Sequence, residues 1–147
     1  MEVQLVMKLL RGILEITFYV ALTAGLIWAV PRALSWALKT SYPLAVVTSG
    51  SMWPVLKTGD LVLVKGTTGD VLGVSDIAVY EHAGGFAIHR VVKKNENTFV
   101  TKGDANRKDD SPVSYDQLVG RALTVAGKPI RIPFVGSVGN FLRGKFL

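Results

Sequence analysis

The sequence contains no cysteine. This absence excludes disulfide bonds, thiolate metal sites and cysteine nucleophiles, but it leaves the compartment open because many extracytoplasmic domains also lack disulfides. Histidine is scarce too, with only His82 and His89. The formal net charge is +6, but the basic residues are scattered and are not interleaved with aromatic side chains. We therefore expect no nucleic-acid partner, and anionic lipid headgroups account more simply for the basic balance.

No cofactor or metal ion is expected from the pattern of side chains. The polar stretch 102–110 contains an Asp-x-Asn spacing at Asp104 and Asn106, which is one element of a calcium loop. An EF-hand loop also needs a glutamate further along the chain, and that glutamate is missing. The stretch alone is typical of a solvated turn.

A long hydrophobic run occurs once, over residues 12–31, and its only charged side chain is Glu15. A helix of this length rises about 1.5 Å per residue and reaches roughly 30 Å, the thickness of a bilayer's hydrocarbon core. A cleaved signal peptide usually has a shorter apolar region, about 7–15 residues, followed by a small-x-small cleavage site. No convincing site occurs before Ser41. We therefore predict one retained transmembrane helix.

Basic residues flank this run on both sides, with Lys8 and Arg11 before it and Arg32 and Lys39 after it. Charge alone therefore does not predict the orientation of the helix. A span that ends between Pro31 and Leu38 leaves roughly 12 to 19 residues before Ser51, and an extended chain covers at most ~3.3–3.6 Å per residue. We expect Ser51 to lie within a few tens of Å of the bilayer.

Beyond residue 40 the pattern changes to short β-prone runs separated by glycine, asparagine and aspartate. This punctuation is typical of a compact β domain, and 147 residues suffice for one modest domain. We predict a mainly β fold of partly closed antiparallel sheets, preceded by an N-terminal tip and membrane anchor over 1–40. The β domain covers 41–147, with strands over 44–47, 61–64, 77–80, 86–92, 98–100 and 119–125.

The C-terminal stretch 130–147 is apolar and glycine-rich, with Arg131, Arg143 and Lys145 among its residues. Phe134 and several later apolar side chains could share one face beside these cations. Two interpretations stay open: a segment seated in the membrane surface, or a last strand followed by a tail.

Ser51 lies in the run Thr-Ser-Gly-Ser-Met-Trp-Pro, residues 48–54. A serine hydroxyl attacks a carbonyl only with a base within hydrogen-bond reach and donors for the oxyanion. Gly50 would let the backbone turn tightly and let a substrate carbonyl approach. Ser49 and Trp53 occupy the glycine positions of a G-x-S-x-G elbow, so an α/β-hydrolase is not indicated. An isolated Ser-Gly-Ser is most often an ordinary loop.

The base for Ser51 must come from another part of the chain. His89 lies in the strand pattern 86–92, and histidine is the side chain that most readily exchanges a proton near neutral pH. His82 lies in a glycine-rich turn, where solvent exposure is the simpler interpretation. Lys65 is the competing base, because a lysine can serve if burial lowers its pKa, although Gly66 beside it suggests a wet turn. A carboxylate from 102–110 could orient the base.

Taken together, these segments resemble type I signal peptidase, in the branch found in archaea and the endoplasmic reticulum. Four features carry the resemblance in the family's order: the apolar span, SGSMWP, AIHRVV and TKGDANRKDD. TGDLVLV and SDIAVY match weaker boxes of the family. Trp53 departs from the motif, because a smaller or acidic residue is more usual there. The likeness covers about residues 10–140.

The resemblance implies roles for individual residues. Ser51 would be the nucleophile, His89 the general base and Asp110 the acid that orients it. Asp104 would support the site's structure or electrostatics. The backbone N–H of Ser51, together with the Ser49 hydroxyl, would form the oxyanion hole. The residues alone do not show which of Asp104, Asp109 and Asp110 reaches the histidine.

The resemblance also implies a substrate and a location. The substrate is the signal peptide of an exported preprotein, cut after small residues at the first and third positions before the bond. The expected location is the cell membrane or the endoplasmic-reticulum membrane, single-pass, with the N-terminus cytoplasmic and the catalytic domain outside. Membrane lipid is an expected partner, and protein-export machinery is a candidate partner. Two alternatives remain, a Ser–Lys protease of related fold that uses Lys65, and a non-catalytic, membrane-tethered β module of an export complex.

Overall fold

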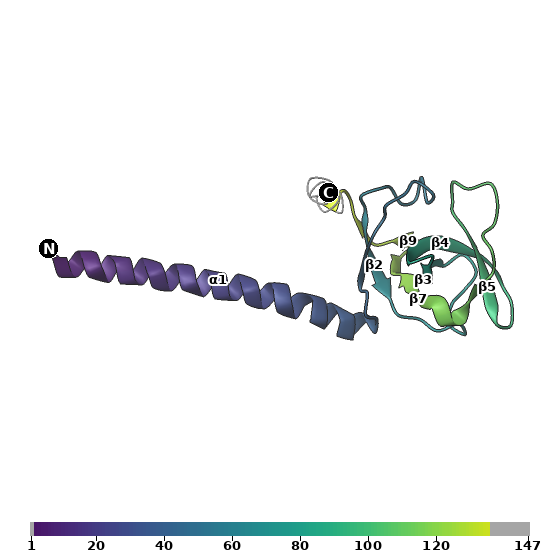
Figure 1. Cartoon of the computed structure of the whole chain (residues 1–147). Helices are drawn as coiled ribbons and strands as arrows, with labels where there is room; N and C mark the ends of the chain where they lie inside the picture. Colours follow the sequence, from purple (N-terminus) through teal and green to yellow (C-terminus); the bar gives the residue numbers. More distant parts are fainter. Residues whose placement is uncertain (1, 136–147) are drawn as a thin grey trace. The chain divides into compact units, whose positions relative to one another are not determined.

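The computed structural model describes residues 2–135 and divides the chain into two compact units, Met1–Ala37 and Leu38–Leu147 (Figure 1). The first unit is helical and the second is built from antiparallel strands. This confirms the predicted class, a mainly β fold with one N-terminal helix that is apolar enough to cross a membrane.

Helix α1 spans Glu2–Leu38 and has no buried residue. Its length and composition suit a membrane span, and its polar groups bond within the helix. Arg11 Nε donates to Glu15 Oε1 at 3.0 Å, and the hydroxyls of Thr17 and Thr23 donate to backbone carbonyls four residues earlier. Polar groups satisfied in this way lower the cost of placing a helix in lipid.

The helix extends beyond the predicted run 12–31 in both directions. Pro31 lies inside it, and the Arg32 guanidinium stacks 4.2 Å from the centre of the Trp28 ring. Hydropathy marks only the apolar part of a helix, whereas the helix itself ends where its backbone hydrogen bonds end. The prediction therefore found the helix and underestimated its length.

The β domain contains one curled eight-stranded sheet and a small two-stranded sheet, and every strand pair is antiparallel. The main sheet has the order β1 (Leu44–Val46), β2 (Leu61–Lys65), β7 (Leu118–Ala122), β3 (Ile77–His82), β4 (Gly85–Lys94), β5 (Thr98–Lys102) and β6 (Val113–Ser114), and β10 (Arg131–Ile132) also pairs with β2. The small sheet joins β8 (Thr124–Val125) to β9 (Lys128–Pro129), and a 3-10 turn, Tyr115–Gln117, precedes β7.

All six predicted strands are present, with small shifts at their ends, and the predicted run 119–125 divides into β7 and β8. The glycine-rich turn between β3 and β4 is a tight hairpin in which Ala83 and Gly84 have φ angles of 43° and 82°. Glycine adopts such angles without a Cβ penalty. Strands β6 and β9 were not predicted, because a two-residue strand carries no periodic signal.

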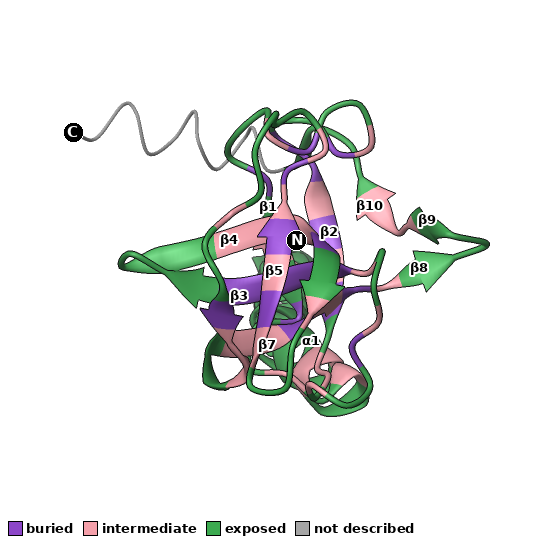
Figure 2. Ribbon diagram, turned by 90° about the vertical axis from the view of Figure 1, so that its right-hand side faces the viewer, coloured by how far each residue is buried: buried purple, intermediate pink, exposed green. Residues whose placement is uncertain are grey.

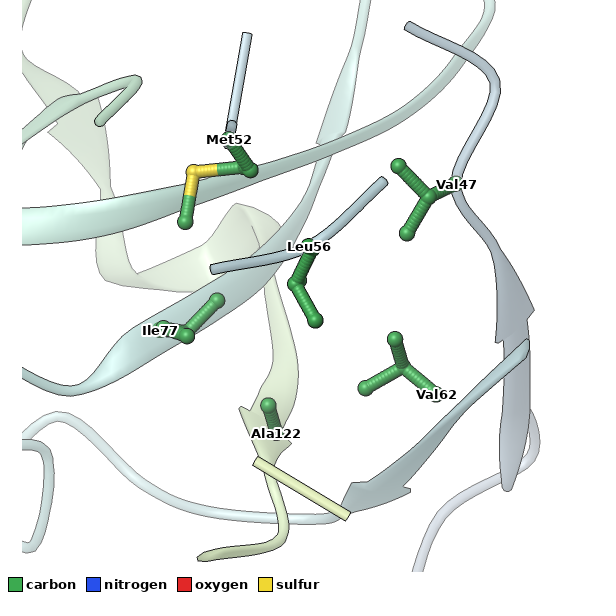
Figure 3. Close-up of a cluster of buried hydrophobic side chains, with 6 residues drawn as sticks. All are labelled: Val47, Met52, Leu56, Val62, Ile77 and Ala122. Carbon is green, nitrogen blue, oxygen red and sulfur yellow. The ribbon is translucent and has the colours of Figure 1, made fainter. Parts of the chain in front are cut away.

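Two clusters of buried side chains fill the domain, and buried residues gather on β3 and β5 (Figure 2). One contains Val47, Met52, Leu56, Val62, Ile77 and Ala122 (Figure 3). The other contains Leu72, Ala78, Tyr80, Val91, Phe99 and Val113. The side chains of β4 alternate between the two clusters, since Ile88 packs against the first cluster, whereas Val91 belongs to the second and Ala87 packs against it.

Strand β10 attaches the last described part of the chain to the domain. Arg131 Nη1 lies 2.6 Å from Oδ2 of Asp60, a carboxylate that is fully buried. Of the two interpretations left open for 130–147, the last strand is present at Arg131–Ile132. The alternative of a membrane-seated segment over 130–147 falls mostly on residues 136–147, which lie outside the described part of the chain.

Candidate active site

Ser51 lies on a loop that the hydrophobic core holds from the next residue onward. Met52 and Leu56 are buried in the first cluster (Figure 3). Two turns fix the backbone between them, because Trp53 N donates to Gly50 O at 3.1 Å and Leu56 N donates to Met52 O at 2.9 Å. The Ser51 hydroxyl therefore projects from a backbone with little freedom to move.

A second loop, residues 103–106, lies against the loop that carries Ser51. Ala105 N donates to Ser51 O at 2.8 Å. Gly103 is buried, and a Cβ built on it would lie only 2.7 Å from the Ser51 carbonyl oxygen, so this position requires glycine. The two loops thus meet through their backbones beside the reactive side chain.

Asp104 holds the second loop through Arg90 of β4. Nε and Nη2 of Arg90 each donate to Asp104 at 2.7 Å, and Nη1 donates to Ser75 O at 2.9 Å. The carboxylate of Asp104 raises the pKa of Arg90 above its usual value, outweighing the opposing effect of burial. This bidentate, charge-assisted pair fixes the loop in position.

His89 connects Ser51 to Asp110. Its Nε2 lies 3.0 Å from Ser51 Oγ, and its Nδ1 lies 2.6 Å from Asp110 Oδ2. The His89 and Asp110 side chains are 16% and 26% exposed, so the contact is shielded but open to water on one side. The Ser49 hydroxyl lies 3.0 Å from Ser51 Oγ.

The donors in this chain of hydrogen bonds follow from its chemistry. A carboxylate only accepts hydrogen bonds, so Nδ1 of neutral His89 carries the ring proton and donates it to Asp110. Nε2 then has a free lone pair and accepts from Ser51. Because the single hydroxyl hydrogen of Ser51 is engaged, Ser49 must be the donor to Ser51 Oγ. The arrangement is the one required for a general base to remove the serine proton.

The same reasoning extends behind Asp110. Thr101 Oγ1 donates to Asp110 Oδ2 at 2.8 Å, and Tyr80 Oη lies 2.9 Å from Thr101 Oγ1. The only hydroxyl hydrogen of Thr101 is given to the carboxylate, so Tyr80 is the donor in the last bond. Burial raises the pKa of the Tyr80 phenol above its ordinary value, which keeps that donor protonated.

A groove of about 380 Å³ opens beside Ser51 and His89. Residues of β1 and the first half of β4 line it, and most of their side chains are apolar: Leu44, Ala45, Val46, Phe86, Ala87 and Ile88. Within residues 2–135, β1 pairs only with β2, and β4 pairs with β5 only from Arg90 onward. The groove therefore lies between two strands with unpaired backbone edges.

Of the predicted site residues, the structure brings Ser49, Ser51, His89 and Asp110 together. Asp104 contacts Arg90 instead of the histidine. The sequence left the choice among three acids open, and the geometry selects Asp110. Asp109, the third of these, is exposed, 3.9 Å from Lys102.

Three further expectations from the sequence concern Lys65, His82 and Gly50. Lys65 is exposed at the end of β2, and its backbone pairs with Arg121. His82 is exposed at the end of β3, as the sequence suggested. Gly50 begins a turn, but that turn does not require glycine at this position. Its φ is not positive, and a Cβ there would meet no atom within 4 Å. Open space above Gly50 remains available to an approaching ligand.

Sequence reasoning missed the contributions of Tyr80, Thr101 and Arg90. Thr101 precedes the Lys-Gly-Asp motif, Tyr80 ends the run SDIAVY, and Arg90 follows His89. All three therefore lie inside or beside the recognised motifs, which was the one signal available. Their contacts join residues that lie 9 to 21 positions apart in the chain, and spacing alone does not reveal such contacts.

Comparison with curated proteins gives consistent relatives, whereas no family model matches the chain. The signal peptidase complex catalytic subunit sec11 of Pyrenophora teres f. teres is 35% identical over 126 residues, which cover 79% of this chain and 70% of the relative. The subunit SEC11 of Lodderomyces elongisporus is 34% identical over 135 residues, 82% and 75% of the two chains. The SEC11 subunit of Metarhizium acridum is 33% identical over 126 residues, 79% and 71%.

Proposed function

The chain belongs to the family of signal peptidase complex catalytic subunits, and from this premise we propose that it is a membrane-bound serine endopeptidase acting on exported preproteins. Membership makes the chain a signal peptidase and confirms the family predicted from its motifs. The observation that supports a serine mechanism is the chain of hydrogen bonds from Ser51 through His89 to Asp110, at the wall of an apolar groove.

In the proposed reaction, His89 Nε2 takes the hydroxyl proton while Ser51 Oγ attacks the carbonyl carbon of the scissile peptide bond. Asp110 holds the imidazole by its Nδ1–H and stabilises the imidazolium that forms. The imidazolium then protonates the departing amine, leaving the signal peptide as an ester on Ser51. His89 removes a proton from water, which hydrolyses the ester and regenerates the serine.

Two donors suit the oxyanion of this reaction, the Ser51 backbone N–H and the Ser49 hydroxyl. The hydroxyl already points at Ser51 Oγ, 3.0 Å away, so a small rotation would turn it to an oxygen that forms beside that atom. The open space above Gly50 leaves room for the substrate carbonyl. Donors oriented in advance stabilise the developing charge at little reorganisation cost.

The groove suits an extended peptide. A peptide strand could pair with the free edges of β1 and β4, while alternate side chains face the apolar lining. The groove of about 380 Å³ is lined mainly by apolar side chains, which favours uncharged residues near the cut. Cleavage after small residues at the first and third positions before the bond is part of this proposal and follows from the family resemblance.

We further propose that α1 is a single-pass anchor with its N-terminus cytoplasmic, so that domain 41–147 acts outside the cytoplasm. The boundary between anchor and domain near residue 40 is part of this proposal, as is the contact of 130–147 with the membrane surface. The relatives are named as subunits of a complex, so partner subunits and export machinery are proposed partners besides membrane lipid.

The test is cleavage of a preprotein in liposomes by the full-length chain and by Ser51→Ala, with the new N-terminus of the product sequenced. We expect the wild type to cut after a small-x-small motif and Ser51→Ala to be inactive. Lys65→Ala is the matched comparison and should retain activity. Equal cleavage by wild type and Ser51→Ala would contradict the proposal, and loss with Lys65→Ala but not with His89→Ala would favour a Ser–Lys mechanism.

A further inference from the structure

Two buried hydroxyl groups lie behind the acid of the site. Thr101 of β5 is fully buried, and Tyr80 of β3 is 3% exposed. Two successive hydrogen bonds connect these hydroxyls to the carboxylate. The first joins Tyr80 to Thr101 at 2.9 Å, and the second joins Thr101 to Asp110 at 2.8 Å. The series ends on Oδ2, the same oxygen that accepts from His89 Nδ1 at 2.6 Å.

The backbone ties the same residues together a second time. Asp110 N donates to Thr101 O at 2.8 Å, so Thr101 contacts both the main chain and the carboxylate of Asp110. The segment between them, 102–109, carries the loop that touches Ser51. Thr101 therefore fixes the distance and the direction of the carboxylate relative to the sheet.

Packing alone does not explain these hydroxyls. Valine has nearly the shape of threonine and phenylalanine that of tyrosine, and both would suit a cluster that contains Phe99 and Val91. Replacing both partners of a buried hydrogen bond by apolar groups of the same shape is nearly neutral or stabilising. A buried polar pair that the fold does not need for stability acts on the group to which it is bonded, and that group is the Asp110 carboxylate.

We propose that Thr101 and Tyr80 are positioning residues of the active site, which orient the Asp110 carboxylate and spread its charge so that it holds His89 in the reactive tautomer. This inference rests on the proposed Ser–His–Asp mechanism. Tyr80 donates to Thr101 and Thr101 donates to Asp110, so Oδ2 keeps one direction open, and that direction points to the imidazole. Without Thr101 the carboxylate can rotate about its bond, and the imidazole loses its fixed partner.

The test compares Thr101→Val with Thr101→Ser in the full-length chain in detergent. For Thr101→Val we expect kcat to fall about tenfold, a part of the roughly 10²- to 10⁴-fold that a positioned acid–base group contributes, with KM unchanged. Thr101→Ser restores the donor and should recover most of the lost rate. Tyr80→Phe, which leaves Thr101 in place, should lower kcat by about threefold.

Two further readouts separate positioning from packing. The first is thermal unfolding of the double variant Thr101→Val, Tyr80→Phe. We expect this variant to be at least as stable as the wild type, although its cleavage of substrate is slower. The imidazole resonances can be followed by NMR because the chain has only two histidines, and His82→Asn identifies the other signal. We expect the His89 Nδ1 proton resonance to move in Thr101→Val and to return in Thr101→Ser.

A wild-type kcat in Thr101→Val would overturn the inference, and so would equal impairment of the valine and serine variants, since that would indicate a packing effect. Ser51→Ala is measured in parallel to keep the two proposals apart. If Ser51→Ala cleaves normally, the serine mechanism itself fails. If Ser51→Ala is inactive while Thr101→Val has the wild-type rate, only the positioning role fails.

Discussion

At the scale of single residues, the two adjacent acids Asp109 and Asp110 show how one backbone step separates different environments. Asp110 is half-buried between His89 and Thr101, whereas the side chain of Asp109 is 61% exposed. They share charge, chemistry and sequence neighbourhood. A difference between their variants therefore reports the contact with the histidine and not a general loss of negative charge.

We predict that Asp110→Asn lowers kcat by roughly 10³- to 10⁴-fold, because an amide no longer selects the Nδ1–H tautomer or stabilises the imidazolium. Asp109→Asn is the matched control and should stay within about twofold of the wild type, since its carboxylate is solvated. Initial rates of preprotein cleavage at saturating substrate measure both. Comparable losses in the two variants would show that the acid has been assigned wrongly.

At the scale of elements, the site depends on the contact between two loops, each of which is held in place by a different part of the domain. The core holds the Ser51 loop through Met52, while Arg90 holds the second loop through Asp104. Where the loops meet there is room for a hydrogen atom and not for a methyl group, because a Cβ on Gly103 would lie 2.7 Å from Ser51 O. Catalytic geometry is therefore sensitive to a residue that performs no chemistry.

We predict that Gly103→Ala lowers kcat/KM by about a hundredfold, since a displacement near 1 Å of a reacting group has an effect of that order. Gly85→Ala is the control, because a Cβ there meets no atom within 4 Å, and its activity should remain within about twofold. The two variants are compared in the cleavage assay after circular dichroism has shown that both are folded. Full activity in Gly103→Ala would mean that the loops separate without consequence.

The positions of the helix and of the longer strands could be predicted from the sequence, whereas their arrangement in space could not. The apolar run revealed α1, and alternation with glycine punctuation revealed strands such as β3 and β4. Sequence did not reveal the sheet order, because β7 inserts between β2 and β3 through pairs of residues 38 to 58 positions apart. It also did not reveal which acid faces His89, since that depends on how β5 and the following loop return to β4.

At the scale of the whole molecule, Tyr80 links the site to the stability of the fold. Burial raises its pKa above the ordinary value of 10.0, while in the unfolded chain the phenol ionises at that ordinary value. Below pH 10 both states hold the proton, so the full contribution to stability is present. Above it, only the unfolded state releases the proton, and stability declines as pH rises through the folded pKa.

We predict that the wild type loses more stability than Tyr80→Phe between about pH 8 and pH 11, a window that spans the ordinary tyrosine pKa. The other three tyrosines are present in both proteins, so their contributions cancel in the difference. Urea unfolding of the β domain in detergent, followed by near-ultraviolet circular dichroism, measures the effect. Identical pH dependence in the two proteins would refute a raised pKa for Tyr80.

Among residues 2–135, β1 and the first half of β4 each have an edge without a strand partner, and this has a consequence for solubility. A strand with free amide and carbonyl groups is a template for any other strand, including one from a second copy of the same protein. The opening that would admit a peptide is therefore also a place where copies can join edge to edge. The net charge of +6 keeps copies apart by repulsion, and a peptide resting in the groove would cap both edges and act as a guard against aggregation.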